Sequence, residues 1–345
     1  MKHSSKIFIL PFIMLLSGSC QKEEITLSDN AKDHFFLKSD GAEMPVWVEG
    51  NTESKTLVIF LHGGPGGSSI GYNELGIFDY LEQYYGVVYW DQRCAGASQG
   101  NCNPDNLTVE SYVNDLDKLI ILLQLRYGSD VGIFLLGDSW GGTLATAYIT
   151  TENFQKKIKG VIVTVGVHNF PLFMQEKQSM LNHFADQQIA LGNRTNDWSN
   201  IKSSISGIDL STIEALNVLQ EKAYLAQTYL EEIDSIQSIN LSGGKPNSLG
   251  FSYILNNNIT SEAMWPQLLD YNLSSKLPNI VIPVALLFGQ YDFVVPPNLA
   301  QDFYDKLNTP NKELYIIENA DHNLGVANGI QTYKDKTSNF IATYK

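Results

Sequence analysis

The stretch that decides the fold runs from residue 133 to residue 142 and reads Ile-Phe-Leu-Leu-Gly-Asp-Ser-Trp-Gly-Gly. The apolar run predicts a buried strand, and residues 143–150, which follow it at once, are compatible with a helix. Strand, sharp turn and helix in this order form a nucleophile elbow, in which the serine hydroxyl is held clear of the sheet. Glycines flank such a turn because side chains there would collide. The stretch therefore predicts a nucleophile at Ser139 rather than an ordinary turn serine.

Other apolar runs predict the remaining strands of a sheet. They lie at residues 56–61, 87–90, 161–165, 283–288 and 314–317, with helical patterns near 72–84, 108–127, 299–307 and 330–344. Residues 35–37 and 46–48 flank Ser39-Asp40-Gly41 and predict an opening hairpin. Alternating apolar strands and helices are typical of a mostly parallel sheet with helices on both faces. We therefore expect an α/β fold with a mostly parallel central sheet.

The alternation of strands and helices is interrupted in the middle of the chain. Between residues 166 and 276 the sequence is helical and polar-rich, with long helical patterns near 173–191 and 212–232. We expect this segment to be a helical cap inserted into one core domain made of residues 34–165 and 277–345. Such a cap would cover the carboxyl edge of the sheet, where folds of this type bind ligands.

The composition excludes some kinds of partner. A net charge of −14 leaves no basic stripe to neutralise phosphates, which argues against nucleic acid. The histidines and cysteines lack the spacing of metal ligands. We expect neither a metal nor another cofactor, and a small peptide, amide or ester as the partner.

The N-terminus predicts export. Lys2, His3 and Lys6 precede an apolar run, residues 7–16, that is too short to span a bilayer. Small residues then lead to Cys20, in a stretch that resembles a bacterial lipoprotein signal, whose cysteine becomes lipidated. We expect residues 1–20 to be this signal and residues 21–33 a tether. The protein would then be membrane-anchored by lipid alone, in the periplasm or at the cell surface; plain secretion is the alternative.

The two other cysteines, Cys94 and Cys102, lie in a loop rich in glycine, proline and asparagine. An exported protein meets conditions that permit disulfides, and a bond between these residues would close a small ring. A disulfide and two free thiols are the alternatives that the sequence leaves open.

A catalytic serine needs a base, and the base needs an orienting carboxylate. In this fold type the chain order is serine, then aspartate or glutamate, then histidine. Asp292 follows one predicted strand and His322 follows the last one, so both stand in the expected places. We therefore expect a triad of Ser139, Asp292 and His322, with Asp321 as the second candidate for the carboxylate.

The tetrahedral intermediate of acyl transfer needs two N–H donors for its negatively charged oxygen. The residue after the nucleophile supplies one, and the loop after the third strand supplies the other. These rules predict Trp140 and Gly64, the latter in the glycine-rich loop at residues 62–67. We expect a structural role for His62, and Gly64–Pro65 is a candidate for a cis peptide bond.

Three motifs together resemble the proline iminopeptidase branch of the α/β-hydrolases. They are His62-Gly63-Gly64-Pro65-Gly66-Gly67, Asp91-Gln92-Arg93 and Gly137-Asp138-Ser139-Trp140-Gly141-Gly142, in the family's order and spacing. The resemblance covers the chain from about Phe35 and implies an α/β-hydrolase fold. It also implies that Asp91 and Arg93 brace the loop near the site. Cys94 departs from the family, in which glycine usually follows the second motif.

The resemblance also implies how a substrate would bind. The family holds the substrate's free amine with glutamates of the cap, but no local motif identifies them in this sequence. The candidates are Glu176, Glu214, Glu221, Glu231, Glu232 and Glu262. Glu231 and Glu232, at the end of the helical pattern near residues 212–232, are examples of residues that could bind the amine.

Together with the predicted triad, the resemblance implies a serine aminopeptidase that releases proline or another small or apolar residue from the N-terminus of short peptides. An esterase, amidase or lactonase of the same fold, acting on small non-peptide substrates, is the alternative. A non-catalytic binding protein is a third possibility, which the intact set of Ser139, Asp292 and His322 disfavours.

Overall fold

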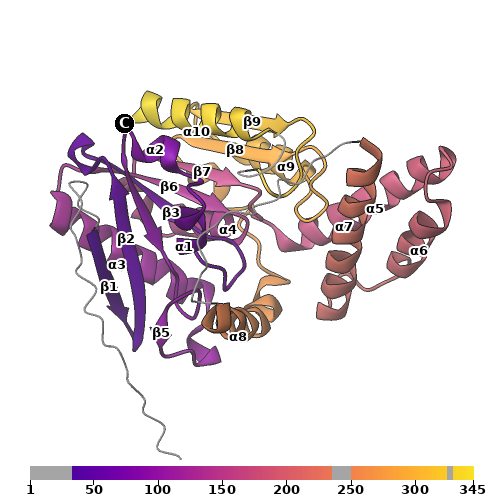
Figure 1. Cartoon of the computed structure of the whole chain (residues 1–345), viewed down its shortest axis with the longest axis horizontal. Coiled ribbons are helices and arrows are strands. Elements are labelled where there is room, and N and C mark those ends of the chain that lie inside the picture. The colour runs from indigo at the N-terminus through magenta and orange to yellow at the C-terminus, as the bar shows by residue number, and fades with distance from the viewer. Residues whose placement is uncertain (1–32, 235–249, 325–328) are drawn as a thin grey trace, which may run out of the picture.

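A computed structural model describes residues 33–234, 250–324 and 329–345, which form a sheet surrounded by helices (Figure 1). The sheet has nine strands in this part of the chain, in the order β1-β2-β4-β3-β6-β7-β8-β9, and β5 pairs with β2. The strands are β1 (Asp33–Ser39), β2 (Ala42–Gly50), β3 (Thr56–Leu61), β4 (Gly86–Trp90), β5 (Gln99–Gly100), β6 (Gly132–Asp138), β7 (Gly160–Thr164), β8 (Val284–Gly289) and β9 (Lys312–Ile317).

The strands from β4 to β9 in this order pair in parallel, whereas β1, β2 and β5 pair antiparallel. Every residue of β3, β7 and β8 is buried, as expected for strands with helices on both faces. The predicted α/β fold with a mostly parallel sheet is confirmed, and the opening hairpin is β1 and β2.

Helices cover both faces of the sheet (Figure 1). Side chains alternate along a strand, so Gly160 and Val163 of β7 face opposite sides. A Cβ built on Gly160 would lie 3.1 Å from Phe340, and a Cβ built on Gly142 would lie 3.0 Å from Val163. The helices that contain Phe340 and Gly142 therefore cover opposite faces of the sheet. The core helices are α1 (Ile70–Glu74), α2 (Asp79–Glu82), α3 (Val109–Tyr127), α4 (Trp140–Ile149), α9 (Asn298–Lys306) and α10 (Ile330–Tyr344), with 3₁₀ turns at Thr52–Ser54, Pro104–Asn106, Phe154–Lys157 and Leu277–Asn279.

The helix predicted near residues 72–84 is wrong in its extent. The chain forms two short helices there, α1 and α2, and Gly76 lies between them with a φ of +65°. This left-handed conformation is open to glycine and ends the first helix. Later in the chain, the helical pattern after residue 108 does form α3, and the Thr108 side chain accepts a hydrogen bond from Ser111 N at its start.

The helices between β7 and β8 form two parts. The first part contains α5 (Phe170–Ala190), α6 (Thr195–Ile205) and α7 (Ile213–Asp234), which pack on one another beyond the edge of the sheet (Figure 1). The second part is α8 (Gly250–Leu268), which lies against core loops. Thr260 Oγ1 of α8 donates to the carbonyl of Cys94 at 2.6 Å, and Asn256 Nδ2 donates to that of Gly96 at 3.2 Å.

The predicted signal and most of the predicted tether, residues 1–32 with Cys20, lie outside the described residues. The tether prediction is wrong at its last residue, since Asp33 begins β1 and its Oδ1 accepts a hydrogen bond from Arg126 Nη2 at 2.6 Å. Across the described ranges, no helix combines the length and apolar character that crossing a membrane requires.

Candidate active site

The elbow lies where β6 ends at Asp138 and α4 begins at Trp140. Between them, Ser139 has φ 53° and ψ −116°, and its N–H donates to the carbonyl of Thr164 at 2.9 Å. A positive φ is uncommon for a residue with a side chain and here turns the chain sharply from strand to helix. A Cβ on Gly137 would collide with the carbonyl of Gly141, which explains why the turn needs glycine there.

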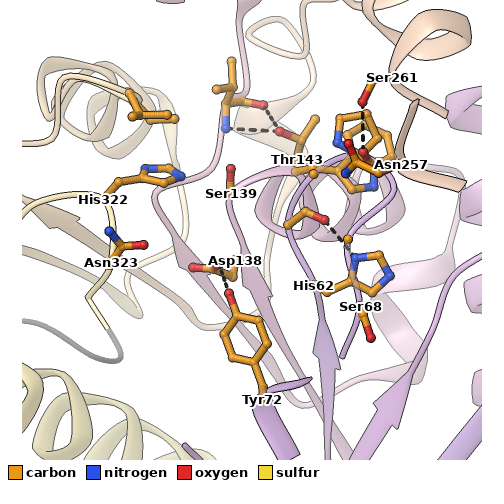
Figure 2. Close-up of a pocket in the computed structure, with 18 of the residues that line it drawn as sticks. His62, Ser68, Tyr72, Asp138, Ser139, Thr143, Asn257, Ser261, His322 and Asn323 are labelled. Carbon is orange, nitrogen blue, oxygen red and sulfur yellow. Dashed lines mark hydrogen bonds between the residues drawn. The ribbon is translucent and has the colours of Figure 1, made fainter. Parts of the chain in front are cut away.

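His322 and Asp292 form a hydrogen-bonded pair beside the elbow. His322 Nδ1 lies 2.8 Å from Asp292 Oδ2, and the backbone N–H of Val295 donates to Asp292 Oδ1 at 2.7 Å. Burial disfavours the charged imidazolium, but the nearby charge of Asp292 and this hydrogen bond outweigh it and raise the pKa of His322. Figure 2 shows the side chain of His322 next to that of Ser139. The structure therefore brings the three predicted residues of the triad to one edge of the sheet.

Asp321, the second candidate for the carboxylate, does not pair with the histidine. Its Oδ1 accepts a hydrogen bond from the backbone N–H of Asn323 at 2.8 Å. The orienting partner of His322 is thus Asp292, and Asp321 stabilises the turn that carries the histidine.

The predicted oxyanion donors border the same space. Trp140 is the first residue of α4, and the first N–H groups of a helix have no partner within the helix. Gly64 has a φ of +126° and precedes a cis peptide bond to Pro65. Gly64 and Trp140 both line the pocket that contains Ser139 and His322.

Gln92 links these two donor segments, a role that the sequence analysis missed. Its Oε1 accepts a hydrogen bond from Trp140 Nε1 at 2.8 Å, and its Nε2 donates to the carbonyl of His62 at 3.2 Å. Its backbone N–H also donates to His62 Nε2 at 3.1 Å. His62 Nε2 is therefore unprotonated, and burial lowers the pKa of His62 below its usual value. His62 is a neutral histidine that supports the loop.

The remaining members of the second motif brace neighbouring loops. Arg93 and Asp115 form a buried ion pair, with Arg93 Nε 2.5 Å and Nη2 2.7 Å from the carboxylate. Asp91 accepts hydrogen bonds from the backbone N–H groups of Ser69 at 2.6 Å and Ala97 at 2.8 Å. These contacts fix the loops after β3 and β4.

Cys94 and Cys102 are joined by a disulfide, with their Cα atoms 5.2 Å apart. The bond closes the loop whose carbonyls accept hydrogen bonds from Thr260 and Asn256 of α8. The disulfide therefore closes the core loop against which α8 packs.

The pocket above Ser139 has a volume of about 730 Å³. This size lies within the range of about 300–1,000 Å³ that is usual for small-ligand sites. Its described lining from the cap is uncharged and largely apolar: Phe170, Phe173, Gln220, Tyr224, Asn257, Ser261, Trp265 and Leu268. The pocket thus suits a small substrate with an apolar part.

The described cap glutamates that the resemblance suggested do not line this pocket. Glu214, Glu221 and Glu262 are exposed, and Glu176 accepts a hydrogen bond from Asn298 of α9 at 2.7 Å. Glu231 and Glu232 are in the last turn of α7, and their side chains lie outside the described residues.

Two polar features of the pocket escaped the sequence analysis. Asp138, whose position in the Gly-x-Ser-x-Gly pattern is unrestricted, faces the pocket and accepts a hydrogen bond from the Tyr72 hydroxyl at 3.0 Å (Figure 2). On the cap side, the Oε1 of Gln220 accepts a hydrogen bond from Lys177 Nζ at 2.5 Å. Burial lowers the pKa of Lys177 to about 7.

Within the described chain, no three histidine, cysteine or acidic side chains gather as a metal site requires.

The chain is similar to known proteins along most of its length. The family model described as alpha/beta hydrolase fold matches residues 56–327. A probable aminopeptidase, YbaC of Bacillus subtilis, is 24% identical over 303 residues, which cover 83% of this chain and 89% of the relative. The proline iminopeptidase of Saccharolobus solfataricus is 26% identical over 274 residues, covering 77% and 78%. The crystal structure of VinJ matches with a TM-score of 0.62 at 19% identity, covering 91% of this chain and 99% of VinJ.

Proposed function

The chain belongs to the alpha/beta hydrolase fold family, and within this family of hydrolases we propose that it is a serine aminopeptidase. It would release proline or another small or apolar residue from the N-terminus of short peptides. The observation that carries the proposal is the hydrogen-bonded pair of Asp292 and His322, 2.8 Å apart, beside the elbow serine in a pocket of about 730 Å³. Similarity to an aminopeptidase and a proline iminopeptidase at 24% and 26% identity supports the peptide substrate.

In the first half of the reaction, Ser139 Oγ attacks the carbonyl carbon of the first peptide bond while His322 Nε2 accepts the hydroxyl proton. Asp292 accepts the Nδ1–H hydrogen bond of His322 and stabilises the imidazolium that forms. The oxygen of the tetrahedral intermediate receives hydrogen bonds from the N–H groups of Trp140 and Gly64. Each such donor is worth ~3 kcal/mol of the barrier.

His322 then gives its proton to the leaving amine as the peptide bond breaks, and the shortened peptide departs with a new free amine. The N-terminal residue stays on Ser139 as an ester, which the second half of the reaction hydrolyses. Water attacks this ester, His322 accepts a proton from the water, and the serine recovers its proton when the amino acid leaves.

The test is a substrate panel. Proline and alanine arylamides, their N-acetylated counterparts and simple acyl esters are compared with the full chain and with Ser139→Ala. We expect turnover of the free-amine arylamides, its loss by at least about 10⁴-fold in the variant, and poor turnover of N-acetylated arylamides. Unchanged turnover in the variant would contradict the serine mechanism.

The second candidate is an esterase, amidase or lactonase that acts on small non-peptide substrates. The uncharged cap lining of the pocket favours it, because neutral acyl groups can be bound there without an ionic partner. Equal turnover of N-acetylated and free-amine substrates in the panel would favour this candidate over the aminopeptidase.

We also propose that the enzyme is exported and held at a membrane by lipid on Cys20. The charged start, the apolar run at residues 7–16 and the small residues before Cys20 support this proposal. In a bacterial host, the full chain should incorporate a fatty-acid label and sediment with membranes, whereas Cys20→Ser should lose the label. Absence of label on the unaltered chain would contradict the proposal.

A further inference from the structure

The described lining of the pocket contains a single acidic side chain, Asp138. This carboxylate lies on the core side, at the end of β6, while the described cap lining is uncharged. A lone acidic group in a largely apolar pocket is a strong source of selectivity, because it is matched by a cation and poorly matched by a neutral group.

Asp138 and the nucleophile border the same small space. A Cβ placed on Gly63 would lie 3.2 Å from Ser139 Cβ and 3.6 Å from Asp138 Oδ2, and glycine leaves this volume open. In an aminoacyl substrate, one carbon atom separates the amine nitrogen from the carbonyl carbon. Asp138 and Ser139 both line the pocket (Figure 2), so an amine bound at Asp138 places the carbonyl carbon next to the segment that carries the nucleophile.

The hydrogen bonds to Asp138 leave room for a ligand. A carboxylate accepts about four hydrogen bonds. The Tyr72 hydroxyl donates to Oδ2 at 3.0 Å, and the Thr164 hydroxyl lies 3.1 Å from Oδ1 but also 3.0 Å from the carbonyl of Gly137. The single proton of Thr164 cannot serve both oxygens fully, so the carboxylate keeps acceptor capacity.

We propose that Asp138 binds the α-ammonium group of the substrate and thereby selects unblocked aminoacyl amides and peptides. The inference rests on the proposed function, because it names the group that recognises the free amine. The inference places recognition of the free amine in the core, whereas the family resemblance implies glutamates of the cap for this role.

The electrostatic surroundings agree with this role. Burial raises the pKa of Asp138, against the opposing effects of nearby His322 and the hydrogen bonds from Tyr72 and Thr164. The charged carboxylate thus lacks full compensation until a cation arrives. A substrate ammonium supplies the missing charge, whereas an N-blocked substrate does not.

The experiment uses two measurements on the full chain and on Asp138→Asn, which keeps the shape and an acceptor for Tyr72. The first is turnover of alanine arylamide, for which we expect KM to rise about 10- to 100-fold in the variant, with a smaller change in kcat. The second is inhibition of simple-ester hydrolysis by prolinamide, which measures amine binding independently of peptidase activity. We expect prolinamide to inhibit the wild type much more strongly than N-acetylprolinamide, and this preference to vanish in Asp138→Asn.

Two control variants separate recognition from structure. Tyr72→Phe removes a hydrogen bond but keeps the charge, and Asp321→Asn removes a charge near His322 that does not line the pocket. Both should keep the preference for prolinamide over its N-acetylated form, and in Asp138→Asn ester hydrolysis should fall less than arylamide turnover.

The outcomes distinguish the two proposals. A wild type that hydrolyses esters and prefers prolinamide, but cleaves no arylamide, contradicts the aminopeptidase and supports amine binding. A preference that persists in Asp138→Asn overturns the role of Asp138. Equal loss of ester and arylamide turnover in that variant also overturns it, since it assigns Asp138 to the structure of the elbow.

Discussion

The two walls of the pocket differ in chemistry and in how firmly they are held. On the core side, His322 and Trp140 each have a hydrogen-bonded partner from a distant part of the chain, Asp292 and Gln92. On the cap side, the described lining is uncharged, and it comes from two separate parts, α5 and α7 on one side and α8 on the other. The hydrogen-bonded groups of the core wall are therefore suited to one reaction, and the cap wall, together with Asp138, to the choice of substrate.

This difference predicts how variants will behave. Changes to the hydrogen-bonded groups of the core wall, such as Asp292 and Gln92, should lower kcat for every substrate, because they disturb groups that act in the transition state. Asp138→Asn should instead raise KM for free-amine substrates. Changes in the cap wall should alter KM from substrate to substrate, because they disturb groups that bind substrate and transition state alike.

Asp292→Asn should have the largest effect on kcat among the variants considered. The amide cannot stabilise the imidazolium and favours the wrong tautomer of His322, so kcat should fall by about 10⁴-fold for arylamides and esters alike. Steady-state kinetics on both substrates measures this, with circular dichroism as a check of folding. Asp321→Asn removes a neighbouring buried carboxylate that accepts a hydrogen bond from the Asn323 N–H; it is the matched control and should stay within a few-fold of the wild type. A similar loss of kcat in both variants would contradict the role of Asp292 as the partner of His322.

Gln92→Ala should come next. It removes the hydrogen bonds at 2.8 Å to Trp140 and 3.2 Å to His62, so the two segments that carry the N–H donors lose their link. Misplacement by about 1 Å can cost about 10²-fold in rate, and we expect a fall of this size in kcat with little change in KM. Gln83→Ala, at an exposed position, is the control. A lower kcat that is restored at lower temperature would indicate lost stability instead.

Much of the core wall was predictable from sequence because its signals are local. The elbow, the glycine-rich loop at residues 62–67 and the positions of Asp292 and His322 each depend on a short motif at a strand end. The rules of parallel sheets then bring these strand ends to one edge.

The remaining features depend on contacts between distant residues. Gln92 bridges His62 and Trp140, and no pattern around Gln92 reveals the bridge. Asp138 occupies a position of the elbow that tolerates any residue, so only its place beside Gly63 shows that it faces the pocket. No local pattern predicts that the cap has two parts. The position of α8 depends on tertiary contacts, the hydrogen bonds from α8 to the carbonyls of Cys94 and Gly96.

The pH dependence of the reaction should reflect the core wall. Asp292 raises the pKa of His322, so the acidic limb of kcat/KM should lie above the usual histidine value of about 6.5. Protonated His322 cannot accept the serine proton, so kcat/KM should fall about tenfold per pH unit below that pKa and level off above it. A simple ester is the substrate of choice, because it carries no titrating amine. An acidic limb below the usual value would contradict the charged partnership of Asp292 and His322.

Gln220→Ala should have the smallest effect and sharpen the contrast with the core wall. Lys177 Nζ donates to Gln220 Oε1 at 2.5 Å, and Gln220 lines the pocket, where its side-chain amide is expected to donate a hydrogen bond to a substrate oxygen. A hydrogen bond of this kind is worth about 1 kcal/mol, which corresponds to a rise in KM of about fivefold, with kcat unchanged. Dipeptide substrates, which carry a carboxylate beyond the cleaved bond, should show the rise more than simple esters. Glu221→Ala, the adjacent and exposed position of α7, should leave KM unchanged for both. A fall in kcat for all substrates would instead give this part of the cap a share in the chemical step, and the division between the two walls would fail.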